Sequence, residues 1–231
     1  MSAIFSLLLL LSQYCYGAEQ FTLQTKPLDI ASPNNPCLYD IDADQRYEVI
    51  ISGVKGDVAA YELPSLKPVW HCHIPTQGLS EPAVGDLLGT GVPILVMGSM
   101  SGKVFFYYAG SGHVLDEFDL GKAIAVAPTI VPNDSTTSPP CDGVALCDVD
   151  GGIHYLRFED GKVREIFTIP NWIQTSANER VELGRVNLPP SVGDIDGDKS
   201  PEIIVGTALG KVVAVSVKDP KHRLVWHAPQ G

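Results

Sequence analysis

Four acidic residues in one short stretch of the chain have the spacing of a metal-binding loop. They hold positions one, three, five and nine of the loop and are Asp194, Asp196, Asp198 and Glu202. Alternate side chains in such a loop can converge on one point, and the carbonyl of Ser200 at position seven is a further oxygen. Hard oxygen ligands suit Ca²⁺, which takes about six to eight of them. The stretch therefore predicts a calcium loop, with Gly197 supplying the tight backbone curvature.

Residues 40–51 repeat this pattern position for position. The predicted ligands of the first repeat are Asp40, Asp42, Asp44, the carbonyl of Arg46 and Glu48. An apolar run, Val49-Ile-Ile51, follows Glu48 as Ile203-Ile-Val205 follows Glu202. Agreement over that many positions predicts two calcium sites of the same design.

An EF-hand is the alternative calcium motif, and the spacing excludes it. That motif requires glycine at position six, glutamate at position twelve and a helix afterwards. Here those positions are Lys199 and Val205, and the β-branched run that follows favours a strand. The other alternative is an acidic turn without metal, but the mutual repulsion of closely spaced carboxylates argues against it.

Two further copies keep the frame of the loop and lose its ligands. The copy that begins at Asp86 has Leu88 and Ile94 at positions three and nine. In the copy that begins at Asp134 we expect Asp142 at position nine, with Thr136 and Ser138 in place of the middle acids. The starts at Asp40, Asp86, Asp134 and Asp194 are 46, 48 and 60 residues apart. An insertion over Pro170–Leu183, which we expect to be a long loop, explains the largest spacing.

Each unit contains four short β-type segments. They are an apolar lead-in, a strand after the loop, a Gly-Lys-Val type strand and a last strand such as Lys67-Pro-Val-Trp70. Four short strands at a period of about 40–50 residues are typical of a propeller blade. Blades bury both faces, which explains continuous apolar runs such as Ile94-Leu-Val-Met97. The predicted fold is an all-β propeller with four four-stranded blades in this chain.

The loops and strands together resemble known propeller repeats. Asp-x-Asp-x-Asp-x-x-x-Glu followed by Ile-Ile-Val-Gly is similar to the FG-GAP or VCBS-type repeat of integrin-α-like propellers, and the Gly-x-Val-x-Ala half of each unit resembles the PQQ-like repeat. The resemblance implies calcium at the acids of both loops. Because related propellers serve as adhesion surfaces, assembly scaffolds and enzyme frames, it specifies architecture more than function. Such propellers usually close with more blades, so these four units close alone, belong to a larger propeller, or associate with another chain.

The N-terminus predicts export from the cytoplasm. Residues 1–17 carry a short apolar run and small residues at a cleavage site, typical of a signal peptide, which leaves residues 18–231 for the propeller. The mature chain would keep four cysteines, whose three possible pairings the sequence does not distinguish. No stretch is apolar enough to span a membrane, and a formal net charge of −11 argues against nucleic acid as a partner. We expect a secreted or otherwise extracytoplasmic protein.

Other residues could perform chemistry, but each has a simpler structural interpretation. On a strand, His71 and His73 would point the same way as a metal pair could, although Trp226-His227 repeats the pattern and favours a last-strand feature. Asp148-Val-Asp150-Gly could hold a cation, but a turn explains it equally well. A quinoprotein or polysaccharide-acting enzyme is an alternative, as is a metal-free PQQ-like scaffold, yet no spacing nominates a catalytic set.

The sequence therefore favours a binding module over an enzyme and leaves the enzymatic alternative open. We expect structural calcium that braces the loops, and a protein or glycan partner at the rim. The candidate contact surfaces are the insertion around Trp172 and the Phe105–Tyr108 strand, although a core position explains the latter better.

Overall fold

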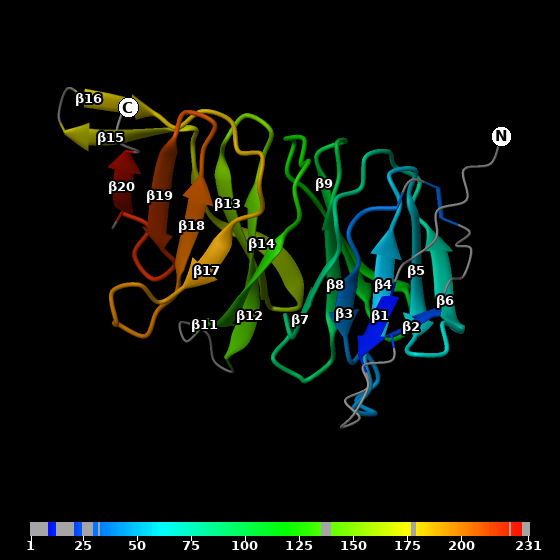
Figure 1. Cartoon of the computed structure of the whole chain (residues 1–231). Helices are drawn as coiled ribbons and strands as arrows, with labels where there is room; N and C mark the ends of the chain where they lie inside the picture. The colour runs from blue at the N-terminus through cyan, green and yellow to red at the C-terminus, as the bar shows by residue number, and fades with distance from the viewer. Residues whose placement is uncertain are drawn as a thin grey trace.

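The computed structural model describes residues 9–12, 21–24, 30–31, 33–134, 140–176, 179–221 and 223–227. Its main body is four antiparallel sheets of four strands each, which stand side by side in chain order (Figure 1). Within every sheet the strands follow one another as a meander, so each sheet is one sequence repeat. The prediction of an all-β fold with four four-stranded blades is confirmed.

The blades are numbered here in chain order. Blade 1 comprises β3 (Cys37–Tyr39), β4 (Glu48–Ser52), β5 (Asp57–Glu62) and β6 (Pro68–His73). Blade 2 comprises β7 (Ala83–Gly85), β8 (Ile94–Gly98), β9 (Lys103–Tyr108) and β10 (His113–Asp119). Blade 3 comprises β11 (Thr129–Asp134), β12 (Cys141–Cys147), β13 (Ile153–Glu159) and β14 (Lys162–Ile169). Blade 4 comprises β17 (Ser191–Gly193), β18 (Glu202–Gly206), β19 (Lys211–Ser216) and β20 (Arg223–His227).

Apolar side chains pack between consecutive blades and hold them together. On β8, alternate residues face opposite neighbours, because side chains alternate across a strand. Leu95 and Met97 pack with blade 1, whereas Ile94 and Val96 pack with blade 3. An edge-to-face contact between Phe106 and Phe158, with ring centroids 5.3 Å apart, joins blades 2 and 3. Burial of each such side chain contributes about 1.5–3 kcal/mol, so the interfaces between blades are the core of the fold.

Two short hairpins lie outside the blades. The pair β15 (Trp172–Ser176) and β16 (Glu179–Glu182) forms an antiparallel ribbon beside blade 4 (Figure 1). The expectation of a long loop over Pro170–Leu183 was therefore wrong. The segment carries Trp172, Ile173 and Thr175 before its turn and Val181 after it, and aromatic and β-branched residues favour strands.

The other hairpin lies near the N-terminus. It joins β1 (Leu9–Ser12) to β2 (Phe21–Gln24). Apart from Leu9–Ser12, the predicted signal peptide over residues 1–17 lies outside the described residues, so that interpretation stays a prediction. Among the residues that the structure describes, no helix has the length and apolar character that crossing a bilayer requires.

The third repeat, whose loop begins at Asp134, differs from the expectation. Gly143, not Asp142, stands opposite Val131, in the ladder position that Glu202 holds opposite Gly193. Because side chains alternate, Asp142 points the other way, toward blade 2. Its Oδ2 accepts the backbone N–H of Asp86 at 2.8 Å, so this carboxylate joins two blades.

The four cysteines that the structure describes, Cys37, Cys72, Cys141 and Cys147, form no disulfide. Cys72 and Cys37 pack against the cluster between blades 1 and 2. Burial raises the pKa of the Cys72 thiol to about 11 and also raises the pKa of Cys147. These thiols act as small apolar side chains in the core.

Candidate metal centre

Both predicted calcium loops connect the first and second strands of a blade. The first runs from Asp40 to Glu48, between β3 and β4, and the second from Asp194 to Glu202, between β17 and β18. In each, the last acid is the first residue of a buried strand. The loops therefore occupy the same place in blade 1 and blade 4.

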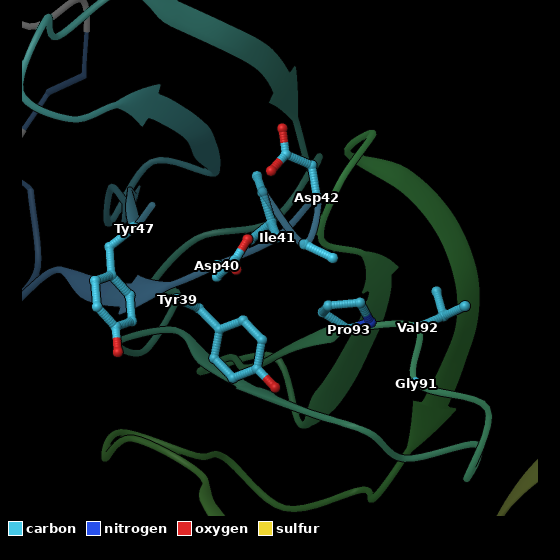
Figure 2. Close-up of a pocket in the computed structure, with 9 residues that line it drawn as sticks. Tyr39, Asp40, Ile41, Asp42, Tyr47, Gly91, Val92 and Pro93 are labelled. Carbon is cyan, nitrogen blue, oxygen red and sulfur yellow. The ribbon is translucent and has the colours of Figure 1, made fainter. Parts of the chain in front are cut away.

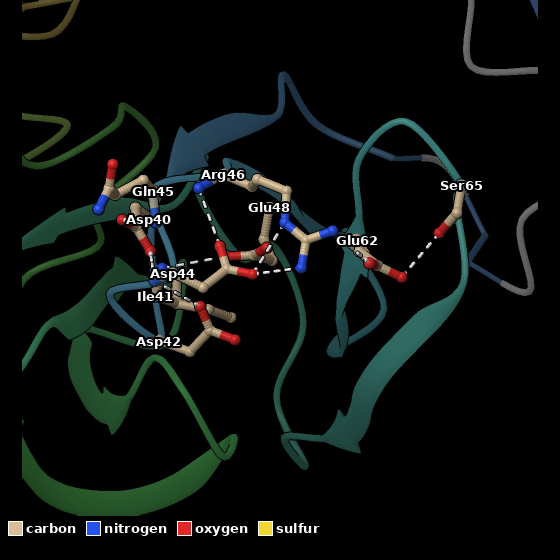
Figure 3. A network of polar contacts seen from close by, with 9 residues as sticks. All are labelled: Asp40, Ile41, Asp42, Asp44, Gln45, Arg46, Glu48, Glu62 and Ser65. Carbon is tan, nitrogen blue, oxygen red and sulfur yellow. Dashed lines mark hydrogen bonds and ion pairs between the residues drawn. The ribbon is translucent and has the colours of Figure 1, made fainter.

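Backbone amides bind the aspartates of the first loop and give it its shape (Figure 3). Asp40 accepts the N–H of Asp44 on Oδ1 at 3.2 Å and the N–H of Gln45 on Oδ2 at 2.9 Å. Asp42 Oδ1 accepts a second contact from the same Asp44 N–H, at 3.2 Å. These local bonds are typical of Asx turns and replace strand pairing across the loop.

The hydrogen bonds of the second loop match those of the first, except that Oδ1 of its first aspartate accepts the N–H of position four instead of position five. Asp194 accepts the N–H of Gly197 at 2.7 Å and that of Lys199 at 3.0 Å. Asp196 and Asp198 each accept the N–H two residues later, at 3.1 and 2.7 Å; for Asp198 the donor is Ser200. Two independent stretches of sequence therefore fold into one loop design.

Positive φ angles at positions four and six give both loops their curvature. In the second loop these are Gly197 (82°) and Lys199 (69°), and in the first they are Ala43 (63°) and Gln45 (69°). Glycine adopts this conformation without steric cost, whereas a Cβ makes it unfavourable. The predicted role of Gly197 is confirmed. At the same position of the first loop, Ala43 adopts a positive φ, which is unfavourable for a residue with a Cβ, so the first loop forms the same turn at a steric cost.

Three carboxylates converge in each loop. Oxygens of Asp40, Asp42 and Glu48 lie within 4.8 Å of one another, and so do oxygens of the equivalent set. That equivalent set is Asp194, Asp196 and Glu202. Of the predicted carboxylate ligands, the structure thus brings together positions one, three and nine.

The acid at position five is turned toward a cation of the protein itself. Asp44 Oδ2 accepts hydrogen bonds from Arg46 Nε at 2.9 Å and Nη2 at 2.5 Å, which lowers the pKa of Asp44. In the second loop the corresponding ion pair is longer, because Asp198 Oδ2 lies 3.8 Å from Lys218 Nζ. The guanidinium of Arg46 therefore competes for one predicted ligand of the first loop only.

The glutamate at position nine is buried in both loops. Glu48 and Glu202 each accept the N–H of the residue at position two, Ile41 or Ile195, at 3.0 Å. Burial raises the pKa of Glu48, and the neighbouring aspartates of the loop raise it further. Glu202 is 4 % exposed, and its Oε1 is buried without a hydrogen-bond partner. An unpaired buried carboxylate oxygen is costly, and a bound cation would satisfy it.

The loop of blade 2 has the same backbone without the ligands. Asp86 accepts the N–H of Thr90 at 3.0 Å and that of Gly91 at 2.8 Å, and Gly89 and Gly91 hold the positive φ angles. Since positions three and nine are apolar there, the loop shape depends on the first aspartate and not on a cation. The two acidic loops are therefore preorganised for a ligand.

A pocket of about 550 Å³ opens beside the first loop, where blade 1 meets blade 2 (Figure 2). Its lining residues are Tyr39, Asp40, Ile41, Asp42, Ala43, Tyr47, Gly91, Val92 and Pro93. Burial, and then the charges of nearby acids that include Asp142 and Asp86, raises the pKa of Tyr39. The lining contains no basic side chain, so the pocket suits a cationic or hydrogen-bonding group of a ligand.

The histidines of β6 face a carboxylate. Trp70 and Cys72 turn toward the core, while His71 and His73 point outward. Asp57 Oδ1 lies 2.9 Å from His73 Nδ1 and 3.8 Å from His71 Nε2. The alternation predicted for the two histidines is confirmed, and their shared neighbour is an acid on the adjacent strand β5.

The other candidate residues serve the fold. Phe105 and Phe106 of the Phe105–Tyr108 strand are buried, which confirms the core interpretation for these two residues, whereas Tyr108 at the end of the strand is 36% exposed. Asp148 closes a turn, because its Oδ1 accepts the N–H groups of Asp150 and Gly152 at 2.8 and 2.9 Å.

Sequence reasoning missed a buried charge network in blade 3. His154 Nε2 lies 3.0 Å from Asp148 Oδ2, and its Nδ1 lies 2.7 Å from Glu165 Oε1. Burial alone would lower the pKa of His154, but the hydrogen bonds and charges of the two acids outweigh burial and raise it. In the sequence only Asp148 pointed to this network, and the turn Asp148-Val-Asp150-Gly explained that acid without a buried partner.

Comparison with known proteins identifies the class of fold. The chain is similar to Sqt1 of Saccharomyces cerevisiae (TM-score 0.70, 14% identity, 98% of this chain and 59% of that one). It is also similar to BBS1N in its complex with ARL6DN (TM-score 0.60, 15% identity, 91% and 60%). A third similar structure is BamB from Moraxella catarrhalis (TM-score 0.53, 17% identity, 83% and 51%).

These similarities show the fold alone. The chain is a β-propeller built from four-stranded blades, and it spans between half and three fifths of the length of these three chains. No protein-family model and no curated protein matches it. The resemblance to FG-GAP, VCBS and PQQ-like repeats therefore stays a prediction.

Proposed function

We propose that this protein is an extracytoplasmic propeller that binds calcium in its two acidic loops and uses its loop-bearing end to bind another protein. Calcium has a structural role in this proposal. It braces the loops of blade 1 and blade 4, and it catalyses no reaction. A glycan is the alternative class of ligand for the same surface.

The observation that carries the calcium proposal is the unpaired Oε1 of buried Glu202 beside Asp194 and Asp196. Hydrogen bonds within the loop satisfy the other carboxylate oxygens only in part, and hard oxygen donors suit Ca²⁺. The residues that would hold the ion are Asp194, Asp196, Asp198, Ser200 and Glu202, and in the first loop Asp40, Asp42, Asp44, Arg46 and Glu48.

Three observations support a protein partner. The pocket beside the first loop combines apolar surface with the phenol groups of Tyr39 and Tyr47, and aromatic side chains are enriched in protein interfaces. Tyr47 on its rim is exposed, and large aromatic side chains are enriched where proteins bind each other. BBS1N, a similar propeller, was crystallised in complex with ARL6DN, so a fold of this class can bind another protein.

A calorimetric titration of the chelator-stripped chain with Ca²⁺ tests the proposal. We expect two sites, of which Asp196→Ala removes one and Asp42→Ala removes the other. Asp160→Asn is the matched control, because it removes one exposed carboxylate at a turn with a φ of 52° that asparagine tolerates. Absence of binding by folded protein would refute the calcium proposal and favour a metal-free PQQ-like scaffold. Binding that survives both aspartate substitutions would refute the assignment of the ligands.

A further inference from the structure

Two histidines and one aspartate gather on the outer strands of blade 1, at the end opposite its calcium loop. His71 and His73 lie two residues apart on β6, so both side chains leave the same face of the sheet. Asp57, the first residue of β5, stands directly opposite His73 in the ladder. Glu62, the last residue of the same strand, pairs with Glu48 of the calcium loop. The length of β5 therefore separates this cluster from the acidic loop.

One carboxylate oxygen of the cluster lies close to a nitrogen of each ring. Asp57 Oδ1 is 2.9 Å from His73 Nδ1 and 3.8 Å from His71 Nε2. Nitrogen and oxygen ligands that bind Zn²⁺ tetrahedrally at about 2.0–2.2 Å lie about 3.3–3.6 Å from one another. The two observed separations lie on either side of this value, so small movements would place all three atoms around one ion.

The side chains are free to make those movements. The three ligand atoms are not all within 4.8 Å of one another, unlike those of the acidic loops, so the two imidazoles must turn toward each other to hold one ion. The side chains of His71 and His73 are 51% and 58% exposed, and the core of blade 1 is built by their neighbours Trp70 and Cys72. Rotation of the imidazoles therefore displaces no core residue.

The same ladder positions in blade 2 hold a cation of the protein itself. Lys103 takes the place of Asp57, and Asp119 and Glu117 take the places of the two histidines. Lys103 Nζ forms an ion pair with Glu117, so a positive charge lies between the third and fourth strands of that blade. Blade 1 has an acid and two neutral donors there instead. Within the part of the chain that the structure describes, the ion pairs of Asp57 are those with the two histidines.

These positions stay accessible when another blade lies beside them. In blade 2 the side chain of Phe105, on the same face of β9 as Lys103, packs in the cluster that joins blades 1 and 2. Lys103 and Glu117 are nonetheless 41% and 43% exposed. The fourth strand is at the edge of its sheet, as β6 is in blade 1 (Figure 1). Exposure of the two histidines therefore does not require the neighbouring face to be empty.

We propose that His71, His73 and Asp57 bind a divalent transition-metal ion, Zn²⁺ foremost, at the edge of blade 1. Two imidazoles and one carboxylate are a set of ligands that Zn²⁺ uses in proteins, with the fourth position left to water or to a group of another molecule. Ca²⁺ takes oxygen ligands, so the site and the acidic loops select different ions. This inference does not rest on the calcium proposal.

Calorimetric titration with Zn²⁺ in excess Ca²⁺ tests the proposal, because Ca²⁺ would occupy the acidic loops. We expect one zinc site, and an affinity at least about tenfold lower in His71→Gln, in His73→Gln and in Asp57→Asn, since each removes one of three ligands. His113→Gln is the matched control, because His113 is an exposed histidine on the last strand of blade 2 that stands opposite Tyr108 and not opposite an acid. Urea unfolding establishes that each variant is folded.

Cu²⁺ in place of Zn²⁺ gives a second readout, since imidazole also suits Cu²⁺. Electron paramagnetic resonance distinguishes nitrogen ligands from oxygen ligands by their hyperfine splitting. We expect nitrogen splitting in the wild type and in His113→Gln, and its loss in the double variant His71→Gln/His73→Gln. A spectrum of oxygen ligands alone in the wild type would overturn the proposal.

The zinc titration can overturn the proposal in two ways. One is the absence of zinc binding by the folded chain up to about 1 mM. The other is binding that persists unchanged in the folded variants of both histidines, because the ion would then be held elsewhere. If the chain bound no calcium and yet lost zinc in the histidine variants, the calcium proposal alone would fail and the zinc site would be supported.

Discussion

Substitution of two equivalent glycines should change stability in opposite directions. Gly98 and Gly206 both end the second strand of a blade, and neither requires a positive φ. At Gly98 a Cβ would lie 2.4 Å from Cγ2 and 2.8 Å from Cβ of Ile124, which is itself fully buried. Favourable carbon contacts lie at about 3.5–4.0 Å, so Ile124 would have to move by roughly 1 Å.

The expected magnitudes follow from these contacts. Overpacking of this kind costs about 1–3 kcal/mol, so we expect Gly98→Ala to lower the free energy of unfolding by about 2 kcal/mol. For a chain of this length that corresponds to a fall of about 4–8 °C in Tm. Gly206→Ala meets no atom, and the lower entropy of the unfolded chain should raise stability by about 0.4–1 kcal/mol. Both substitutions lower the entropy of the unfolded chain by the same amount. The difference in the free energy of unfolding between the two variants therefore measures the contact of residue 98 with Ile124, before blade 3.

Urea unfolding of both variants measures these changes. The unfolding slope m should stay constant, which shows that stability and not the compactness of either state has changed. If Gly206→Ala lost as much stability as Gly98→Ala, a side chain at residue 206 would be meeting other atoms, and the reasoning from the two Cβ positions would be refuted. If Gly98→Ala were neutral, the packing of Ile124 against blade 2 would be wrong.

Three further predictions concern single side chains. Because the pKa of His154 is raised in the folded state, protonated His154 stabilises the fold fully below the ordinary histidine pKa of 6.5, and this contribution is lost as the pH rises through the folded-state pKa. Urea unfolding of the wild type should therefore show a free energy of unfolding that falls above about pH 6.5. An equal pH dependence in His154→Gln would contradict this. Because the pKa of Cys72 is about 11, its thiol in the folded protein should react with a thiol reagent at pH 8 at least about a hundredfold slower than in urea. Mass spectrometry of labelled peptides measures both rates, and equal rates would show that Cys72 is not held in the core. Arg46→Gln removes the guanidinium that binds Asp44 and should strengthen calcium binding by the first loop without affecting the second. Calorimetry measures this in a chain that also carries Asp196→Ala, so that only the first loop binds calcium. Weaker binding would show that Arg46 supports the site.

The overall architecture could be predicted because it repeats. The loops at Asp40 and Asp194 share positions, and the strands after them have the composition of buried strands, so fold class and blade number followed from alignment of the chain with itself. The places where the prediction was wrong are those where the repeat is interrupted. At Pro170–Leu183 the apolar and β-branched residues pair within the insertion, and around Asp142 the loop differs in length, which shifts the ladder by one residue.

The sequence alone determined which residues could form the candidate metal site, because the spacing of the acids along the loop is local information. Only the tertiary structure decided how those acids are used. It turned Asp44 toward Arg46, buried Glu202 with one oxygen unpaired, and brought His154 between Asp148 and Glu165. It also left Val212 exposed where the equivalent Val104 is covered. Spacing fixes which side chains can meet in a loop, whereas burial and pairing depend on neighbours distant in sequence, which only the packed blades supply.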